Sequence, residues 1–290
     1  MKNKTKKVPK KIMIFVLLGF LLIVFLLLGA FYGTFPESSI YVPPSFLRVL
    51  VRTGLDVDAK DDLGFTPLHV CSMLGQYDHI KTLISCGADL EARNNQGWTA
   101  LHIAVINYRG CLDTIRLLLE SGADIEARTD DGVTPLMWAA SKNDAPKLIQ
   151  YLTDHGSDIS AGDIEGKTSL HYAVLFEKYL STKTLLSNGA DIMAASHQGI
   201  TPLESALTLK DKRFANLLTE CVDVGQKDVK GKTPLHVVAM SGDEELAKVL
   251  IERGADIAAK DSNGENPLQL ARMYNFPGSK IVEYLESLEN

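Results

Sequence analysis

Hydrophobic positions in most of this chain recur in short groups that have the spacing of helix faces, and polar turns separate the groups. Leu68, Cys71 and Ser72 have the spacing of one side of a short helix, and Ile80 and Leu83 predict a second helix. A helix pair of this size cannot cover its own apolar side, so it needs neighbours of the same kind. The pattern therefore predicts a stack of helix pairs.

The turn before the first helix of each pair carries a six-residue signature that returns every 32 to 35 residues. Its copies are GFTPLH at 64–69, GWTALH at 97–102, GVTPLM at 132–137, GKTSLH at 166–171, GITPLE at 199–204, GKTPLH at 231–236 and GENPLQ at 264–269. Gly-Ala-Asp or Gly-Ser-Asp follows most copies, at 87–89, 122–124, 156–158, 189–191 and 254–256. A constant period of this kind indicates an array of identical supersecondary units.

The signature has the composition of a turn that leads into a helix. Gly64 is free to take a positive φ in the turn, and Thr66 is a natural N-cap. Pro67 suits the first helical position, because its missing N–H costs nothing there. We expect Gly75 to end this helix and Gly87 to end the next one.

These signatures resemble those of the ankyrin repeat, and the resemblance covers residues 45–290. It implies an all-α fold, an ankyrin-repeat solenoid of helix pairs joined by hairpin-like turns. The expected segments are an N-terminal half-repeat at 45–60, repeats at 61–93, 94–128, 129–162, 163–195, 196–227 and 228–260, and a C-terminal capping repeat at 261–290. The repeat at 196–227 fits the pattern least well, because it lacks one residue and has Cys221 at a glycine position.

A histidine closes four copies of the signature, at His69, His102, His171 and His236. No Cys, Asp or Glu is added beside it at metal-ligand spacing, so we interpret it as a structural residue rather than a metal ligand or an acid–base group. It is expected to hydrogen-bond the loop backbone between neighbouring repeats. Met137, Glu204 and Gln269 replace it in the other copies, and looser joints are expected there.

Residues 12–32 form an uncharged run of 21 residues before the repeats. A helix of this length measures about 31 Å, enough to cross a hydrocarbon core of about 30 Å. We therefore expect a single transmembrane helix that is retained as an anchor, followed by a linker at 33–44. A signal peptide cleaved near Ala30 is the rival interpretation, although its apolar region normally has about 7 to 15 residues.

The lysines predict how this anchor is oriented. Residues 1–11 contain six lysines and no acidic residue, whereas residues 33–47 contain no Lys or Arg. The positive-inside rule then places the basic tail in the cytoplasm. The chain is accordingly expected to be a single-pass membrane protein whose ankyrin domain is periplasmic or otherwise extracytoplasmic.

The repeat region itself is acidic. Without the six lysines of the tail, 24 basic and 36 acidic side chains remain, a formal charge of −12. This charge disfavours nucleic acid as a partner and favours a protein with a neutral or basic surface, although plain solubility also explains it. Four cysteines in 290 residues do not make a disulfide framework, and we expect them to be unpaired, with Cys111 the most reactive.

No motif in the chain supports catalysis or a cofactor. It has no Gly-rich phosphate loop, no His-Glu-x-x-His, no Cys-x-x-Cys and no nucleophile elbow, so we expect neither an enzyme nor a small-molecule substrate. The ankyrin resemblance implies that a protein partner is held by the hairpin tips and the inner helices. The apolar candidates at those positions are Phe65, Met73, Leu74, Trp98, Ile106, Val133, Trp138, Tyr172, Leu175, Phe176, Ile200, Leu209, Met240, Met273 and Tyr274. Packing between repeats is the alternative role, above all for Trp138 and Tyr172.

The sequence thus predicts a membrane-tethered, non-enzymatic module for protein–protein interaction, either a scaffold or an inhibitor of the immunity type. The alternative is a soluble secreted ankyrin protein that binds host proteins as an effector after cleavage near Ala30. An enzymatic role is a distant third interpretation.

Overall fold

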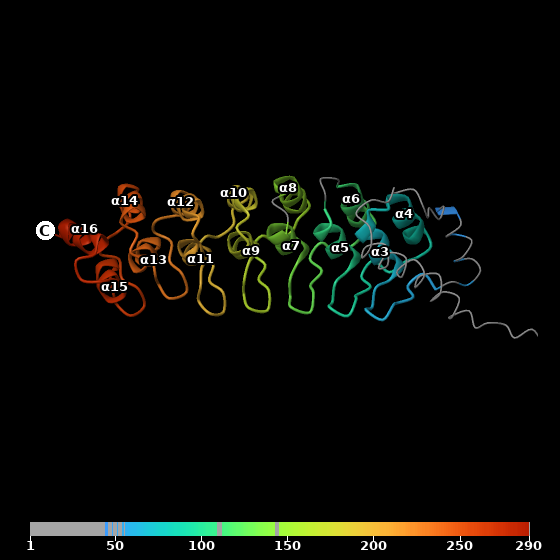
Figure 1. Cartoon of the computed structure of the whole chain (residues 1–290), viewed down its shortest axis with the longest axis horizontal. Coiled ribbons are helices and arrows are strands. Elements are labelled where there is room, and N and C mark those ends of the chain that lie inside the picture. Colours follow the sequence, from blue (N-terminus) through green and yellow to red (C-terminus); the bar gives the residue numbers. More distant parts are fainter. Residues whose placement is uncertain are drawn as a thin grey trace, which may run out of the picture. The chain divides into compact units, whose positions relative to one another are not determined.

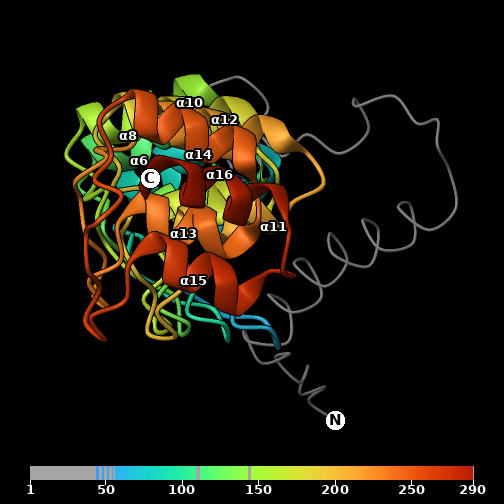
Figure 2. The ribbon, with the colours of Figure 1, turned by 90° about the vertical axis from the view of Figure 1, so that its left-hand side faces the viewer.

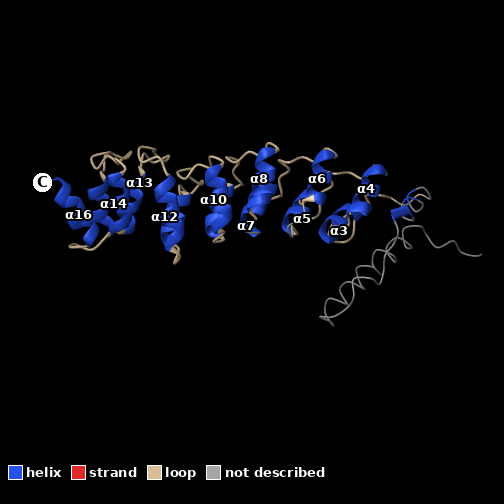
Figure 3. Cartoon of the chain, turned by 90° about the horizontal axis from the view of Figure 1, so that it is seen from above, coloured by secondary structure: helices blue, strands red, loops and turns tan. Residues whose placement is uncertain are grey.

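The computed structural model describes residues 44, 45, 48, 51, 54, 56–108, 112–142 and 145–289. The basic tail at 1–11, the apolar segment at 12–32 and the linker as far as residue 43 lie outside the described residues. Figure 3 shows helices joined by loops, and the described residues contain one isolated β-bridge, between Gly162 and Thr168. No described helix is long and apolar enough to cross a membrane.

Fourteen short helices make up seven consecutive pairs in the described residues. They are α3 (Pro67–Leu74), α4 (Tyr77–Ser85), α5 (Ala100–Ile106), α6 (Asp113–Glu120), α7 (Pro135–Lys142), α8 (Pro146–Asp154), α9 (Ser169–Leu175), α10 (Tyr179–Ser187), α11 (Pro202–Thr208), α12 (Lys212–Cys221), α13 (Pro234–Ser241), α14 (Glu244–Glu252), α15 (Pro267–Tyr274) and α16 (Lys280–Glu289). As the signature predicts, α3 begins at Pro67 and is followed by Gly75 with a left-handed φ of 66°. The all-α fold inferred from the sequence is confirmed over these residues.

The chain divides into two compact units. Unit 1 consists of residues 1–107 and 113–123, and its described helices are α3 to α6. Unit 2 consists of residues 108–112 and 124–290, and it holds α7 to α16. Each unit is a stack of helix pairs, and the repeat bounds given from the sequence stay a prediction.

In unit 2 the helices form two layers. The inner helices α7, α9, α11, α13 and α15 each contact the next one, and so do the outer helices α8, α10, α12, α14 and α16 (Figure 1). Figure 2 shows α16 beside α14 and α15, which it contacts. Leucines of the outer layer are buried at the same place in each repeat, at Leu152, Leu185, Leu218, Leu250 and Leu285. Small residues bring the inner helices close together, with buried alanines at Ala139, Ala173, Ala206, Ala239 and Ala271.

The start of each inner helix is held by a capping arrangement. The backbone N–H of Thr233 donates to Nδ1 of His236, three residues later, over 3.1 Å. The same bond recurs in five of the six other repeats, for Thr66 with His69, Thr99 with His102, Thr168 with His171, Thr201 with Glu204 and Asn266 with Gln269. A polar side chain at the third helical position is thus part of the helix start itself.

The histidine ring also reaches the neighbouring repeat. Nε2 of His171 donates to the carbonyl of Ile200 over 3.0 Å, and Nε2 of His236 donates to that of Glu265 over the same distance. In unit 1, Nε2 of His69 donates to the carbonyl of Trp98 over 2.8 Å. A carbonyl only accepts and a backbone N–H only donates, so both bonds form only when the proton sits on Nε2.

Hairpin turns connect successive repeats, and most of them are tied tip to tip. The backbone N–H of Ser262 donates to the carbonyl of Lys230 over 2.9 Å, and that of His197 donates to the carbonyl of Glu165 over 2.8 Å. Gly231 lies in such a tip with a φ of 74°, and a Cβ placed there would come within 2.9 Å of the Ser262 nitrogen. This glycine is therefore required both for its backbone angle and for the close approach of the next hairpin.

The repeat at 196–227 is the exception in unit 2, in keeping with its poor fit to the pattern. Glu204 caps Thr201 but, within the fully described segment 196–233, makes no bond to the next hairpin. No backbone hydrogen bond joins the tips 196–200 and 228–232 in that segment either. The joint between α11 and α13 thus lacks two ties that the neighbouring joints have.

The buried histidines predict a pH dependence of stability. Burial lowers the pKa of His69, His171 and His236 below the ordinary 6.5. The carbonyl that each ring bonds raises the pKa, but its effect is smaller than that of burial. The unfolded chain then binds more protons than the folded chain as the pH falls below 6.5. We expect the free energy of unfolding of residues 45–290, measured by urea denaturation, to be highest above pH 6.5. It should decrease as the pH falls from 6.5 to 5.

Substitution of these histidines with glutamine removes the titratable ring and keeps the acceptor that caps the helix. Gln269 already accepts the N–H of Asn266, so His171→Gln and His236→Gln are expected to keep the cap and lose the bond to the next hairpin. Each should lower stability at pH 7.5 by about 1 kcal/mol and flatten the dependence between pH 6.5 and pH 5. An unchanged slope in the double variant would show that other groups cause it.

Two glycine substitutions separate backbone strain from crowding. Gly231 and Gly254 have similar positive φ values of 74° and 91°, but a Cβ at Gly254 meets nothing within 4 Å. We expect Gly254→Ala to cost about 1–2 kcal/mol from the left-handed backbone alone. Gly231→Ala should cost clearly more in the same urea denaturation experiment, because Ser262 must also move. Equal costs would contradict the close packing of the hairpins.

Candidate functional site

The strongest candidate site is a group of large side chains on the inner helices of unit 2. Tyr172 and Leu175 belong to α9, Phe176 follows directly after it, and Trp138 comes from α7. The exposed fractions of Leu175 and Phe176 are 54% and 45%, and Trp138 and Tyr172 are half-buried. We call these four residues the aromatic patch. Large apolar side chains left open to solvent in one place are typical of surfaces that bind another molecule.

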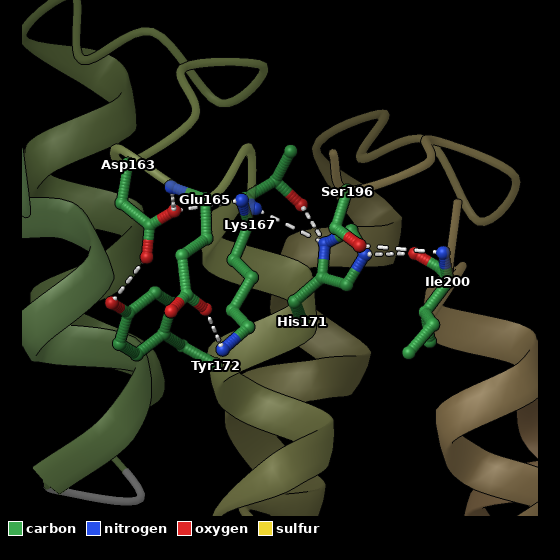
Figure 4. A network of polar contacts seen from close by, with 8 residues as sticks. Asp163, Glu165, Lys167, His171, Tyr172, Ser196 and Ile200 are labelled. Carbon is green, nitrogen blue, oxygen red and sulfur yellow. Dashed lines mark hydrogen bonds and ion pairs between the residues drawn. The ribbon is translucent and has the colours of Figure 1, made fainter. Parts of the chain in front are cut away.

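A loop carboxylate fixes the ring of Tyr172. The Tyr172 hydroxyl donates to Oδ2 of Asp163 over 2.7 Å, while Oδ1 of Asp163 accepts from the backbone N–H groups of Glu165 and Lys167 (Figure 4). Burial raises the pKa of the Tyr172 phenol, and its bond to the negatively charged Asp163 raises it further. The hydroxyl therefore stays protonated and remains a donor at neutral pH.

This bond is not needed to form the turn. Asp228 occupies the position of Asp163 two repeats later, and its Oδ1 accepts from Lys230 and Lys232 in the same way. Val237 stands there in place of Tyr172, and Oδ2 of Asp228 is buried without a hydrogen-bond partner among the described residues. The turn folds in both cases, so the tyrosine at 172 adds a fixed aromatic ring beyond what the repeat requires.

The rings of the patch are supported from below and from the sides. Trp138 and Tyr172 pack against a buried cluster of Val133, Met137 and Ala161. The rings of Tyr172 and Phe176 stack with centroids 6.2 Å apart and an interplanar angle of 17°. Trp138 and Tyr172 thus pack against the same cluster from neighbouring repeats, and both remain half-buried.

Charged groups border the aromatic patch. Nζ of Lys142 lies 5.5 Å from the centre of the Trp138 ring, within the range of a cation–π interaction. Glu165 and Lys167 form an ion pair beside Tyr172 (Figure 4). An apolar centre with a charged rim is the usual anatomy of a protein-binding surface.

The other candidates from the sequence differ in exposure. Leu74, Ile200, Met273 and Tyr274 are exposed, with exposed fractions of 44%, 42%, 61% and 58%. The half-buried ones are Phe65, Met73, Trp98, Ile106, Leu209 and Met240. Val133 is only 5% exposed and lies inside the cluster beneath the aromatic patch, so we leave it out of the proposed surface.

In unit 1 the candidates lie on or beside α3 and α5. The Phe65 ring meets the ring of His69 edge to face, with centroids 5.7 Å apart. Met73 and Leu74 lie at the other end of the same helix, where Leu74 is exposed. Leu74 is thus the exposed candidate of unit 1, and the other candidates of this unit are half-buried.

Several exposed apolar residues were not among the candidates from the sequence. Leu63, Ile164 and Val229 lie at hairpin tips with exposed fractions of 62%, 62% and 76%, and Phe276 after α15 has 87%. An apolar residue inside an otherwise polar turn such as Asp-Ile-Glu-Gly is the signal that could have identified the first three.

No group of three or more His, Cys, Asp or Glu side chains among the described residues could hold a metal ion. Burial raises the pKa of the Cys71 thiol to about 12, which makes it an inert, thiol-form side chain. Cys86 and Cys221 are free, and Cys111 lies outside the described residues.

Known proteins resemble this chain over its repeats. A putative palmitoyltransferase ZDHHC13 of Danio rerio is 31% identical over 146 residues, 49% of this chain and 22% of that protein. Rabankyrin-5 of Mus musculus is 31% identical over 153 residues, 51% of this chain and 13% of that protein. Protein PhlB of Serratia liquefaciens is 36% identical over 110 residues, 37% of this chain and 48% of that protein. The chain spans less than half the length of these curated relatives, so their activities as whole proteins do not transfer to it.

A solved structure shows the same fold. The crystal structure of the ankyrin repeat domain of Bcl-3, a member of the IkappaB protein family, superimposes with a TM-score of 0.65 and 29% sequence identity. The superposition covers 77% of this chain and 99% of the Bcl-3 chain. The family model for ankyrin repeats matches residues 41–129, 125–196 and 199–289. This chain belongs to the ankyrin repeat family, whose fold is typically a scaffold for binding other proteins.

Proposed function

We propose that this chain is a membrane-anchored, non-enzymatic module that binds another protein through the inner helices and hairpins of its ankyrin repeats. The exposed aromatic patch of unit 2 carries the proposal. Its rings are fixed in place by Asp163 and by the cluster around Met137, so they lose little freedom when a partner covers them. Aromatic anchors of this kind contribute much of the energy in protein interfaces.

The membrane anchor is proposed from the sequence. Residues 12–32 have the length and apolar character of a membrane-spanning helix, and the six lysines before them have the distribution of a cytoplasmic tail. The ankyrin repeats would then face the periplasm. A protein tethered there either holds an envelope complex together as a scaffold or neutralises an incoming enzyme as an inhibitor of the immunity type.

The chemistry of the partner follows from the composition of the chain. Outside the tail the chain carries a formal charge of −12, which attracts basic rather than acidic surfaces over long distances. The aromatic patch itself is apolar. We therefore propose a protein partner with an apolar contact surface and, over the chain as a whole, a basic or neutral surround, and no nucleic acid or small-molecule substrate.

The binding surface can be tested with a photocrosslinking amino acid placed at one position at a time. At position 176 it should capture one defined protein in cells, whereas at Lys183, on the outer helix α10 of the same repeat, it should not. Tyr172→Ala and Leu175→Ala should each weaken that capture at least about tenfold, as expected for hot-spot residues. Equal capture from both positions would contradict a partner on the inner surface.

The anchor can be tested by fractionation. The full chain should stay in the membrane during carbonate extraction, leave it only with detergent and keep residues 1–32 on N-terminal sequencing. An alkaline phosphatase fused after Asn290 should be active, since that enzyme needs an extracytoplasmic location. A soluble chain that begins just after Ala30 would overturn the anchor and support the secreted form.

A further inference from the structure

The joint between α11 and α13 lacks a third tie, besides the histidine bridge and the backbone bond between hairpin tips. Elsewhere a basic side chain at the start of a hairpin donates to a carbonyl one repeat later, from Lys60 to Arg93, from Arg128 to Gly162 and from Lys227 to Lys260. Ala195 occupies this position before the tip at 196–200 and has no donor to offer. The joint between α13 and α15 thus has all three ties, whereas the joint between α11 and α13, which the structure describes completely, has none of them.

Lys230 places a flexible side chain against the hairpin before it. Its Nζ and Cε lie so close to Gly199 that a Cβ there would come within 2.6 Å of either atom. A lysine stem adapts to a changed distance between the hairpins, whereas a backbone hydrogen bond holds one distance. The inner helix α11 also packs less extensively on α13 than α13 does on α15. The inner side of this joint is therefore the least constrained.

The outer side of the same joint is held more firmly. Arg253, which directly follows α14, donates from Nη1 to the carbonyl of Thr219 and from Nη2 to the carbonyl of Val222, the second over 2.7 Å. Both carbonyls lie at the C-terminal end of α12. At the other end of these helices, Nζ of Lys212 and Oδ2 of Asp243 form an ion pair over 2.6 Å. Polar bonds thus join α12 to α14 at both ends.

The arginine compensates for a missing helix ending. The outer helices α8, α10 and α14 are each followed by a glycine with a positive φ, at Gly156, Gly189 and Gly254. Cys221 stands at that position in the repeat at 196–227, and the chain leaves α12 through Val222 with a φ of −67°. The last carbonyls of a helix need donors from outside it, and Arg253 supplies two from the next repeat. His155 and Asn188, at the position of Arg253 in earlier repeats, bond carbonyls of their own helices instead.

We infer that unit 2 bends at the joint between α11 and α13. The hairpins at 196–200 and 228–232 change their separation on the inner side, while Arg253 and the pair of Lys212 with Asp243 keep α12 and α14 together. Closure movements in proteins are commonly rotations about an attachment that persists in both states. In a repeat stack each repeat contacts only its neighbours, so one loosely tied joint bends without disturbing the others.

Bending at this joint changes the shape of the inner surface. The aromatic patch lies on α7 and α9, before the joint, whereas the exposed Met273 and Tyr274 lie on α15, after it. A partner that covers both groups would hold unit 2 at one angle. This consequence rests on the proposed function, but the bending itself does not, and it is tested without a partner.

Distances between pairs of spin labels on the full chain in detergent test the bending. Labels attached to a genetically encoded amino acid leave the native cysteines in place. Exposed positions are available at Gln198, Val229 and Ser262 on three successive hairpin tips, and at Glu220 and Glu252 on α12 and α14. We expect the distance distribution for 198 with 229 to be at least about twice as broad as that for 229 with 262. The distribution for 220 with 252 should be as narrow as the latter.

One substitution should restore a missing tie. Glu204→His places an imidazole where His171 and His236 bond the next hairpin, so its Nε2 should donate to the carbonyl of Lys232. The distribution for 198 with 229 should then narrow to that of 229 with 262. Glu204→Gln is the matched control, because it removes the same charge and keeps the cap as Gln269 does. It should leave the distribution broad.

A second substitution tests the outer attachment. Arg253→Gln removes the two bonds to α12 and should broaden the distribution for 220 with 252, whereas Lys183→Gln on α10 also removes one positive charge and should not. Equal breadth for the two hairpin pairs in the parent chain would overturn the inference, because the joint would then be as rigid as its neighbour. Equal distributions in Glu204→His and Glu204→Gln would show that the missing bond does not loosen the joint. A broad distribution for 220 with 252 in the parent chain would remove the outer attachment.

Discussion

The stack depends on a histidine that joins two repeats at once. Its Nδ1 accepts the N–H at the start of its own helix, and its Nε2 donates to a carbonyl in the next hairpin, as for Thr168, His171 and Ile200 (Figure 4). Only the neutral ring with its proton on Nε2 makes both bonds. One such bond contributes about 1 kcal/mol net, but it also sets the position of each hairpin relative to the helix before it.

The copies that lack histidine show which of these two functions is dispensable. Glu204 and Gln269 still accept the N–H at their helix start, because the Oε atom of each side chain reaches back that far. The described residues end with α16, the outer helix that follows Gln269, and show no further hairpin to which its side chain could bond. Glu204 lies in the middle of unit 2, and there the missing bridge coincides with missing tip contacts between two hairpins. Helix capping is thus maintained throughout, while the coupling between repeats varies.

Periodicity made the helices and their starts predictable, since each copy of the signature contains residues that favour the same turn and the same helix cap. The chemistry of the surface was less predictable. Tyr172 is fixed by Asp163, nine residues earlier in a loop, and Asp228 shows that the same loop forms without such a partner. Whether an aromatic ring in the array packs or projects depends on contacts of this kind, which the repeat pattern does not encode. Hence Val133 proved to be buried, whereas Leu175 and Phe176 are exposed.

The same limit applies to charge. Counting residues makes the repeat region acidic, yet Asp228 uses one oxygen to accept backbone N–H groups of its own turn and is only 8% exposed. An acid used in this way shapes the turn and contributes little to the surface that a partner meets at short range. In a repeat protein the structural residues recur and are buried, and recognition is therefore left to the few positions that change from one repeat to the next.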